Sequence, residues 1–212
     1  MSDELTPQLL LQAYGMGIFP MAESRDSDAL FWVDPTDRGV FPLDGFYISR
    51  SLRRAILAAD YRIAVNSDFE GTMRHCADRP ETWINDDIFA LYGMLHDMGH
   101  AHSLEVWRGD TMIGGVYGVS LGGAFYGESM FSGATNGSKI ALAYLVDRLR
   151  MGGFALFDTQ FITPHLATLG AVEIPRAAFQ EELAAALELN GNFNAPATPS
   201  PQLLIQRSTQ TS

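Results

Sequence analysis

The sequence has 212 residues, of which 47% are hydrophobic, and its formal net charge is −11. This length and composition predict one globular domain or one with a small appendage, and the acidity excludes broad nonspecific binding to nucleic acid. A single cysteine, Cys76, excludes an intrachain disulfide and favours a reducing compartment. Because no apolar stretch reaches membrane-spanning length and the N-terminus is acidic and polar, we expect a cytoplasmic protein without a membrane partner.

In chain order, the first element is a small N-terminal domain, predicted over residues 1–40. Thr6 and Pro7 are typical of a helix start, since threonine caps the first free amides and proline is tolerated in the first turn. Gly15 indicates the end of this helix. Proline and glycine then interrupt an aromatic-rich stretch up to Gly45, so this part has no large core of its own.

Residues 41–190 predict one α/β domain, because apolar residues recur there with helical spacing in some segments and as short runs in others. The expected helices are Ser51–Ala59, Asp68–Cys76, Asp86–Met98, one capped by Ser138 and ending at Met151, a short one from Thr163, and Pro175–Leu189. The expected strands are Tyr61–Val65, His102–Arg108, Met112–Leu121, Ala124–Phe131 and Phe154–Phe157. Tight-turn glycines join the middle three strands into a meander. Residues 191–212, rich in Asn, Pro, Ser, Thr and Gln, predict a flexible tail.

Polar side chains at strand ends mark a candidate site between Gly114 and Gln160. Glu128 lies at the end of one predicted strand, and Asp158 and Gln160 lie at the end of another. A carboxylate beside apolar positions is costly unless it is paired or lies in a solvated cleft. Two interpretations therefore stay open from these residues. Each carboxylate is satisfied by backbone amides or an arginine, or the two together bind a cation such as an amine or a guanidinium.

Three other motifs are less informative. The segment SGATNGSK, residues 132–139, has the residues of a phosphate loop in the wrong order, so a nucleotide role is not expected. The histidines between residues 96 and 102 lack the spacing of a metal site and have no cysteine nearby, so the sequence predicts no metal. One face of a predicted helix carries Arg50, Arg53 and Arg54, which indicates either a phosphate-binding patch or a solvated helix face.

A resemblance to a known family rests on sequence blocks that occur in this order: FWVDP, ISRSLRR, TWINDDI, GHAHSLEVWRG, IGGVYGVSLGGAFYGESMFS, NGSK, FDTQF and LGAVEIPR. From about Leu9 to about Phe179, the chain resembles the leucyl/phenylalanyl-tRNA–protein transferases. The resemblance implies a small N-terminal domain packed on a larger domain with a GNAT-type, acyltransferase-like fold. Such a domain has a mixed, largely antiparallel sheet.

The implied reaction moves leucine or phenylalanine, and less well methionine, from aminoacyl-tRNA to a protein with an N-terminal arginine or lysine. The product carries an N-terminal degradation signal. Because the aminoacyl ester is already activated, the reaction needs neither a cofactor nor a metal. The implied partners are the acceptor end of aminoacyl-tRNA and proteins with a basic N-terminus, and we expect the enzyme to be a monomer.

The resemblance also assigns catalytic roles. Asp158 would orient Gln160 by hydrogen bonding, and the Gln160 carbonyl would accept a hydrogen bond from the incoming amine. Glu128 would help to hold the cationic acceptor N-terminus. Whether Asp158, water or a tRNA hydroxyl removes the amine proton stays open.

Binding roles follow from the same resemblance. The aminoacyl side chain would occupy an apolar pocket formed by Val116, Phe125, Met130, Leu142, Leu145, Leu149 and Phe157. Trp32 and Trp107 would stack on the terminal adenosine. The phosphates of tRNA would contact the arginine cluster of Arg50, Arg53 and Arg54.

Two other functions remain as alternatives at this point. An acyl-CoA-dependent N-acetyltransferase on the same fold would carry an R/Q-x-x-G-x-G/A pyrophosphate loop between a strand and a helix, and the sequence has none. A non-catalytic binder of basic N-termini would use Glu128 and Asp158 without turnover.

Overall fold

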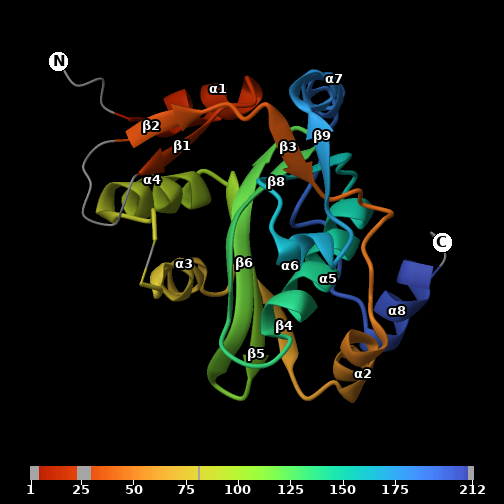
Figure 1. Cartoon of the computed structure of the whole chain (residues 1–212). Helices are drawn as coiled ribbons and strands as arrows, with labels where there is room; N and C mark the ends of the chain where they lie inside the picture. Colours follow the sequence, from red (N-terminus) through yellow and green to blue (C-terminus); the bar gives the residue numbers. More distant parts are fainter. Residues whose placement is uncertain (1–4, 23–29, 81, 210–212) are drawn as a thin grey trace.

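The computed structural model describes residues 5–22, 30–80 and 82–209. Within them, a seven-stranded sheet has the order β4-β5-β6-β7-β8-β3-β9, and β1 pairs with β2 in a second sheet (Figure 1). All described neighbours are antiparallel except β7 and β8. The predicted α/β fold with a mixed, largely antiparallel sheet is confirmed. The strands are β1 (Phe19–Ala22), β2 (Leu30–Val33), β3 (Asp37–Val40), β4 (Arg62–Val65), β5 (Ala101–Arg108), β6 (Thr111–Leu121), β7 (Ala124–Ser132), β8 (Leu156–Gln160) and β9 (Val172–Pro175).

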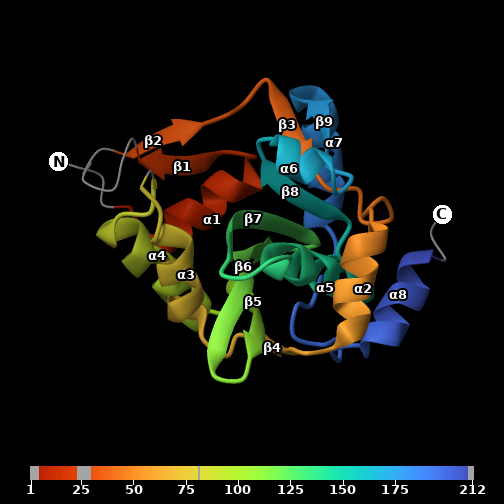
Figure 2. The same cartoon turned by 60° about the horizontal axis from the view of Figure 1, so that its bottom comes forward.

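Helices cover both faces of the large sheet (Figures 1 and 2). One buried cluster packs α1, α3, α4 and α7 on one face, and a second packs α2, α5 and α8 on the other. Val116 and Tyr117 on β6 belong to different clusters, as strand alternation requires. In the described part of the chain, no helix is long and apolar enough to cross a membrane. The helices are α1 (Pro7–Gly15), α2 (Arg50–Ala58), α3 (Phe69–Ala77), α4 (Asp86–Asp97), α5 (Gly137–Met151), α6 (Pro164–Ala167), α7 (Arg176–Leu187) and α8 (Pro201–Thr209).

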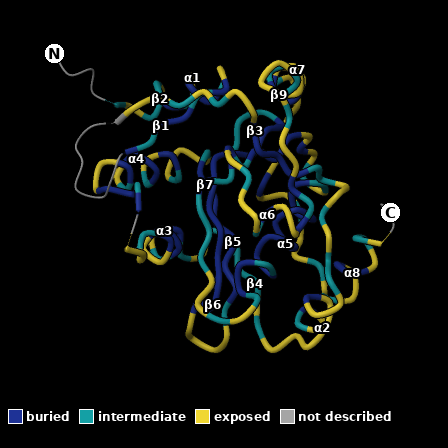
Figure 3. The backbone as a smooth tube through the Cα atoms, in the orientation of Figure 1, coloured by how far each residue is buried: buried dark blue, intermediate teal, exposed yellow. Residues whose placement is uncertain are grey.

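The central strands of the large sheet are the most deeply buried part of the fold, as the dark tube of β5 and β6 shows (Figure 3). They form the predicted meander with β7, and Gly109 and Gly122 occupy its tight turns with φ of 57° each. One local prediction is wrong. The residue that caps α5 is Asn136, with φ of 68° and no side-chain cap hydrogen bond, whereas Ser138 already lies in the first turn.

The separation of β7 from β8 positions the site. These parallel strands pair only from Ala124 opposite Leu156 to Tyr126 opposite Asp158. Strand β7 continues to Ser132, whereas β8 ends at Gln160 and pairs with β3 along its other edge. The residues of β7 beyond Tyr126 therefore face an opening instead of a neighbouring strand.

The C-terminal segment differs from the flexible tail expected for residues 191–212. Up to residue 209 it packs on the protein, with Phe193 stacked on His102 and with Leu204 and Ile205 of α8 buried. The Arg148 guanidinium donates to the Phe193 carbonyl oxygen at 2.6 Å. Although the segment is mostly polar, its few apolar side chains, Phe193, Leu204 and Ile205, bury enough surface to hold it on the protein. Residues 210–212 of the expected tail lie outside the described residues.

Candidate functional site

A cavity of about 280 Å³ opens where β7 and β8 separate. Its apolar wall combines β6, β7, β8, α5 and α6 through Val116, Met130, Phe157, Leu142 and Leu166. Its polar groups come from Arg79, Glu128, Ser129, Thr159 and Gln160. Aromatic side chains of Phe19, Trp83 and Phe161 complete the lining. A concave apolar pocket with a few converging polar groups is typical of a small-molecule or acyl-group site.

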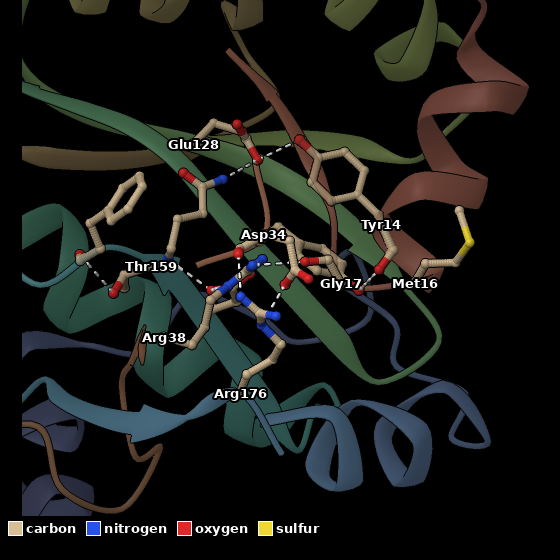
Figure 4. A network of polar contacts seen from close by, with 12 residues as sticks. Tyr14, Met16, Gly17, Asp34, Arg38, Glu128, Thr159 and Arg176 are labelled. Carbon is tan, nitrogen blue, oxygen red and sulfur yellow. Dashed lines mark hydrogen bonds and ion pairs between the residues drawn. The ribbon is translucent and has the colours of Figure 1, made fainter. Parts of the chain in front are cut away.

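Glu128 belongs to a network of polar contacts beside the cavity, and Figure 4 shows its contact with Tyr14. It is only 8% exposed, and its carboxylate accepts from Tyr14 Oη at 2.6 Å, Tyr92 Oη at 3.0 Å and Gln160 Nε2 at 2.9 Å. Burial raises the pKa of Glu128 to about 7, although these hydrogen bonds oppose the rise. Glu128 therefore changes its charge near neutral pH.

The proton count of this network supports the raised pKa of Glu128. The hydroxyl oxygens of Tyr14 and Tyr92 lie 2.5 Å apart, so Tyr14, Tyr92 and Glu128 make three oxygen–oxygen contacts. Two tyrosine hydroxyls supply only two protons to these contacts. A proton on Glu128 supplies the third, which favours the neutral carboxyl.

Gln160 is held at two points. Its φ of 64° places it in the left-handed region, and its backbone N–H donates to Asp158 Oδ1 at 2.7 Å. Its side-chain Nε2 donates to Glu128. The amide oxygen makes no hydrogen bond to any described residue, and Gln160 lines the cavity. This oxygen is therefore free to accept a hydrogen bond from a bound molecule.

For Asp158 the structure favours the first of the two interpretations left open by the sequence, a carboxylate satisfied by an arginine and a backbone amide. Asp158 has no exposed surface, and its carboxylate is paired with Arg38, whose Nε donates to Oδ1 at 2.9 Å and whose Nη2 donates to Oδ2 at 2.6 Å. The expectation that Asp158 and Glu128 together bind a cation is wrong, because Asp158 is already neutralised and does not line the cavity. Within the described network, the Gln160 side chain is oriented by Glu128, while Asp158 holds the Gln160 backbone.

The apolar pocket residues expected from the sequence fall into two groups. Val116, Met130, Leu142 and Phe157 line the cavity. The other three are buried in the core beside it without lining it: Phe125, Leu145 and Leu149. All three leucines of α5 are buried in the same core cluster, and of them Leu142 lines the cavity. Leu166 on α6 lines the cavity and was not predicted.

The two tryptophans expected to stack on adenosine are far apart in the fold. Trp32 is 45% exposed on β2, opposite Pro20 of β1, which lines the cavity. Trp107 lies at the end of β5, with the Arg62 guanidinium 4.8 Å from its ring centroid, and does not line the cavity. Because β6 separates β5 from β7, Trp107 is not placed at the site. Trp83, between α3 and α4, lines the cavity instead.

The arginine cluster, Arg50, Arg53 and Arg54, lies on α2, and all three side chains are exposed while Leu52 and Ile56 face the core. None of the three takes part in an ion pair with a described residue. The single cysteine, Cys76, is buried, and burial raises the pKa of its thiol to about 12. Such a thiol is not an activated nucleophile.

Sequence reasoning missed Tyr14, Tyr92, Arg38 and Trp83. A signal existed for the tyrosines, because a tyrosine on the apolar face of a helix must find a hydrogen-bond partner for its hydroxyl. Tyr92 shares the buried face of α4 with Ile88 and Leu95. No local pattern indicated the partner, since Tyr14 lies 114 residues from Glu128 in the sequence.

Comparison with known proteins identifies the family. A family model described as leucyl/phenylalanyl-tRNA protein transferase matches residues 40–184, and a model of the N-terminal domain of the same family matches residues 3–36. A leucyl/phenylalanyl-tRNA–protein transferase of Cereibacter sphaeroides is 63% identical over 98% of each chain. One from a Ruegeria species is 64% identical over 98% of this chain and 99% of its own.

The fold is shared with a more distant protein. The crystal structure of FemX is 12% identical, with a TM-score of 0.51, and the match covers 78% of this chain and 66% of FemX. This likeness, together with the strand order, confirms the expected GNAT-type fold class. The two family models together match most of the sequence, and the chain belongs to the leucyl/phenylalanyl-tRNA protein transferase family of aminoacyltransferases.

Proposed function

We propose that this protein transfers leucine or phenylalanine, and less well methionine, from aminoacyl-tRNA to the N-terminal arginine or lysine of acceptor proteins. The observation that carries the proposal is the apolar cavity beside the Glu128–Gln160 pair, with the free amide oxygen of Gln160 at its wall. The product would bear an N-terminal degradation signal. The family supports both substrate classes, aminoacyl-tRNA and a protein acceptor.

The reaction is an aminolysis. The acceptor α-amine attacks the carbonyl carbon of the aminoacyl ester, a C–N bond forms, and the C–O bond to the tRNA ribose breaks. The amine gives up a proton, and the departing ribose oxygen takes one up as a hydroxyl. Because the ester is already activated, these steps need neither ATP nor a metal. The amine has an ordinary pKa of about 7.7–8.0 and attacks only in its neutral form.

The site supports specific roles in this reaction. The Gln160 amide oxygen accepts a hydrogen bond from the acceptor amine and orients it toward the ester. Ionised Glu128 attracts the cationic acceptor residue and holds the Gln160 amide in place. Val116, Met130 and Leu142 contact the aminoacyl side chain through apolar surface. Such a pocket distinguishes side chains by only about 1–3 kcal/mol per methylene, so related apolar donors are all accepted.

Two parts of the protein would contact the tRNA. Trp83 in the cavity lining would stack on the terminal adenosine, and Trp32 on β2 lies opposite the cavity residue Pro20. The exposed Arg50, Arg53 and Arg54 of α2 would contact phosphates of the acceptor stem. In an acidic protein, such contacts position the stem locally without a broad affinity for nucleic acid. We propose that the enzyme acts as a cytoplasmic monomer.

The decisive experiment incubates the protein with labelled leucyl-tRNA and a peptide with an N-terminal arginine. We expect leucine on the peptide, much less with an N-terminal glutamate peptide, and no acetyl transfer from acetyl-CoA. Gln160→Ala should lower turnover while leaving the affinity for leucyl-tRNA within about twofold, because the aminoacyl pocket is kept. Acetyl transfer would indicate the acyl-CoA alternative, and binding of the arginine peptide without transfer would indicate a non-catalytic binder.

A further inference from the structure

Arg38 is a buried arginine that connects four parts of the fold at the site (Figure 4). It lies on β3 with 1% of its surface exposed and forms the two-pronged ion pair with Asp158 on β8. Its Nη1 donates to the Gly17 carbonyl oxygen at 2.7 Å. Its guanidinium carbon lies 4.7 Å from the ring centroid of Phe19 and 4.4 Å from that of Phe179, so two aromatic rings pack against the guanidinium.

This environment restricts what Asp158 can do. Its carboxylate accepts three hydrogen bonds, two from Arg38 and one from the Gln160 backbone N–H. Burial raises the pKa of Asp158, and the Arg38 guanidinium opposes that rise. Asp158 has no exposed surface and does not line the cavity, so a bound acceptor amine does not contact its carboxylate directly. The contribution of Asp158 is therefore geometric.

The geometric consequence concerns the residue that faces the cavity. Gln160 is a non-glycine residue with a φ of 64°, a conformation that costs on the order of 1–2 kcal/mol and needs support from its surroundings. The charge-assisted hydrogen bond from its N–H to Asp158 gives that support. Asp158 is itself held in place by the fork of Arg38, which has a fixed planar geometry.

We propose that Arg38 is a positioning residue: through its ion pair with Asp158 it fixes the left-handed backbone of Gln160, and with it the direction of the Gln160 amide. The inference rests on the proposed function, in which that amide orients the acceptor amine. It assigns Asp158 a structural partner in place of a proton-transfer role. It also makes a turn of the N-terminal part, through Gly17, a support of the reacting groups.

The test is a mutant cycle measured by kcat and KM with leucyl-tRNA and an N-terminal arginine peptide. Arg38→Met removes the charge and should lower kcat by about 10²-fold, the cost of a small misplacement of a reacting group, with the KM for leucyl-tRNA nearly unchanged. Arg38→Lys keeps the positive charge but loses the two-pronged hydrogen bonding, so its kcat should lie between those of Arg38→Met and the wild type. Adding Asp158→Asn to Arg38→Met should recover kcat by at least about tenfold, because no unpaired charge remains and the asparagine oxygen still accepts from Gln160.

Arg176→Met is the matched control, because Arg176 likewise joins α7 to the N-terminal part through Asp34 and the Pro35 carbonyl but does not contact Asp158. Its kcat should match the wild type. A second readout is the backbone amide resonance of Gln160, which should shift in Arg38→Met and Arg38→Lys but not in Arg176→Met. This measurement needs no turnover, and if Arg38→Met fails to fold, Arg38→Lys and Asp158→Asn carry the test.

Two results overturn the proposal. If Arg38→Lys and Arg38→Met turn over like Arg176→Met, Arg38 does not position the site. If the double variant is no faster than Arg38→Met while Asp158→Asn alone is inactive and folded, the reaction needs the charge of Asp158 itself. A wild-type protein that transfers no leucine, with the Gln160 resonance still dependent on Arg38, would refute the proposed function and leave the positioning role intact.

Discussion

The substitution Glu128→Gln should make the protein more stable at pH 8 and less active. Burial raises the Glu128 pKa from 4.5 to about 7 in the folded protein, so between these values the folded state binds more protons than the unfolded state. The free energy of unfolding of the wild type therefore falls as the pH rises through this window. A shift of this size corresponds to about 3 kcal/mol.

Glutamine reproduces the protonated form of Glu128 without titrating. Its oxygen can accept from Tyr14 and Gln160, its amide can donate to Tyr92, and the Tyr92 hydroxyl can then donate to Tyr14, so every observed contact is kept. The stability difference between Glu128→Gln and wild type should thus grow by about 3 kcal/mol from below pH 4.5 to above pH 7. For a chain of this length, that gain raises Tm by about 6–12 °C.

The assay is urea denaturation of both proteins across this pH range, with transfer measured in parallel at pH 8. The variant should turn over more slowly at pH 8, because it lacks the negative charge that attracts the acceptor residue. The exposed Glu173 of β9, as Glu173→Gln, controls for the loss of one charge. A stability difference that does not change with pH would refute the raised pKa of Glu128.

Three further predictions concern the other parts of the molecule. Trp83→Ala should weaken binding of a short aminoacyl-adenosine analogue by about 1–3 kcal/mol in a competition assay, whereas Trp107→Ala should leave it unchanged. Arg53→Glu should reduce kcat/KM for full-length leucyl-tRNA much more than for that analogue. In the wild type, each phosphate contact should lower the log of the tRNA affinity by about 0.9 per decade of salt. If the ratio of the two kcat/KM values is the same in Arg53→Glu and wild type, the arginine cluster is only a solvated helix face. Leu204→Ala should lower the free energy of unfolding by about 2–5 kcal/mol, whereas Leu203→Ala, at a more exposed position, should lower it little. If both variants lower it by the same small amount, the C-terminal segment is a flexible tail, as the sequence predicted.

The sequence predicts the elements with strong periodicity or clear start and stop signals, including the short β4 and α6, and misses four other short strands. The meander, α4 and α5 follow from apolar spacing and turn glycines. Strands β1, β2, β3 and β9 have four residues each, and their pairing is decided by distant partners. The tail was misjudged because composition averages over the segment, whereas a few buried residues, Phe193, Leu204 and Ile205, anchor it.

The candidate site could be predicted in part for the same reason. Glu128 and Gln160 were found because carboxylates and amides on apolar strands are rare and conspicuous, although Glu128 lies in the middle of β7 and not at its end. Tyr14, the partner of Glu128, and Arg38, the partner of Asp158, were not found, since each lies more than a hundred residues from the residue it contacts. Trp107 was expected at the site on sequence resemblance alone, and only the strand order shows that β5 lies on the far side of β6 from the cavity.

The first forty residues contribute directly to the environment of the reacting groups. Tyr14 of α1 donates to Glu128, the Gly17 carbonyl accepts from Arg38, and Phe19 of β1 both packs on Arg38 and lines the cavity. Arg38 itself enters the large sheet on β3, beside Gln160. A chain beginning at residue 41 would therefore leave Asp158 buried without its counter-charge, and Glu128 would keep only the Tyr92 hydroxyl and the Gln160 amide as described donors. The GNAT-type domain supplies Glu128, Asp158, Gln160 and most of the apolar cavity wall. The N-terminal part supplies the counter-charge of Asp158, a second hydroxyl donor to Glu128 and part of the cavity lining.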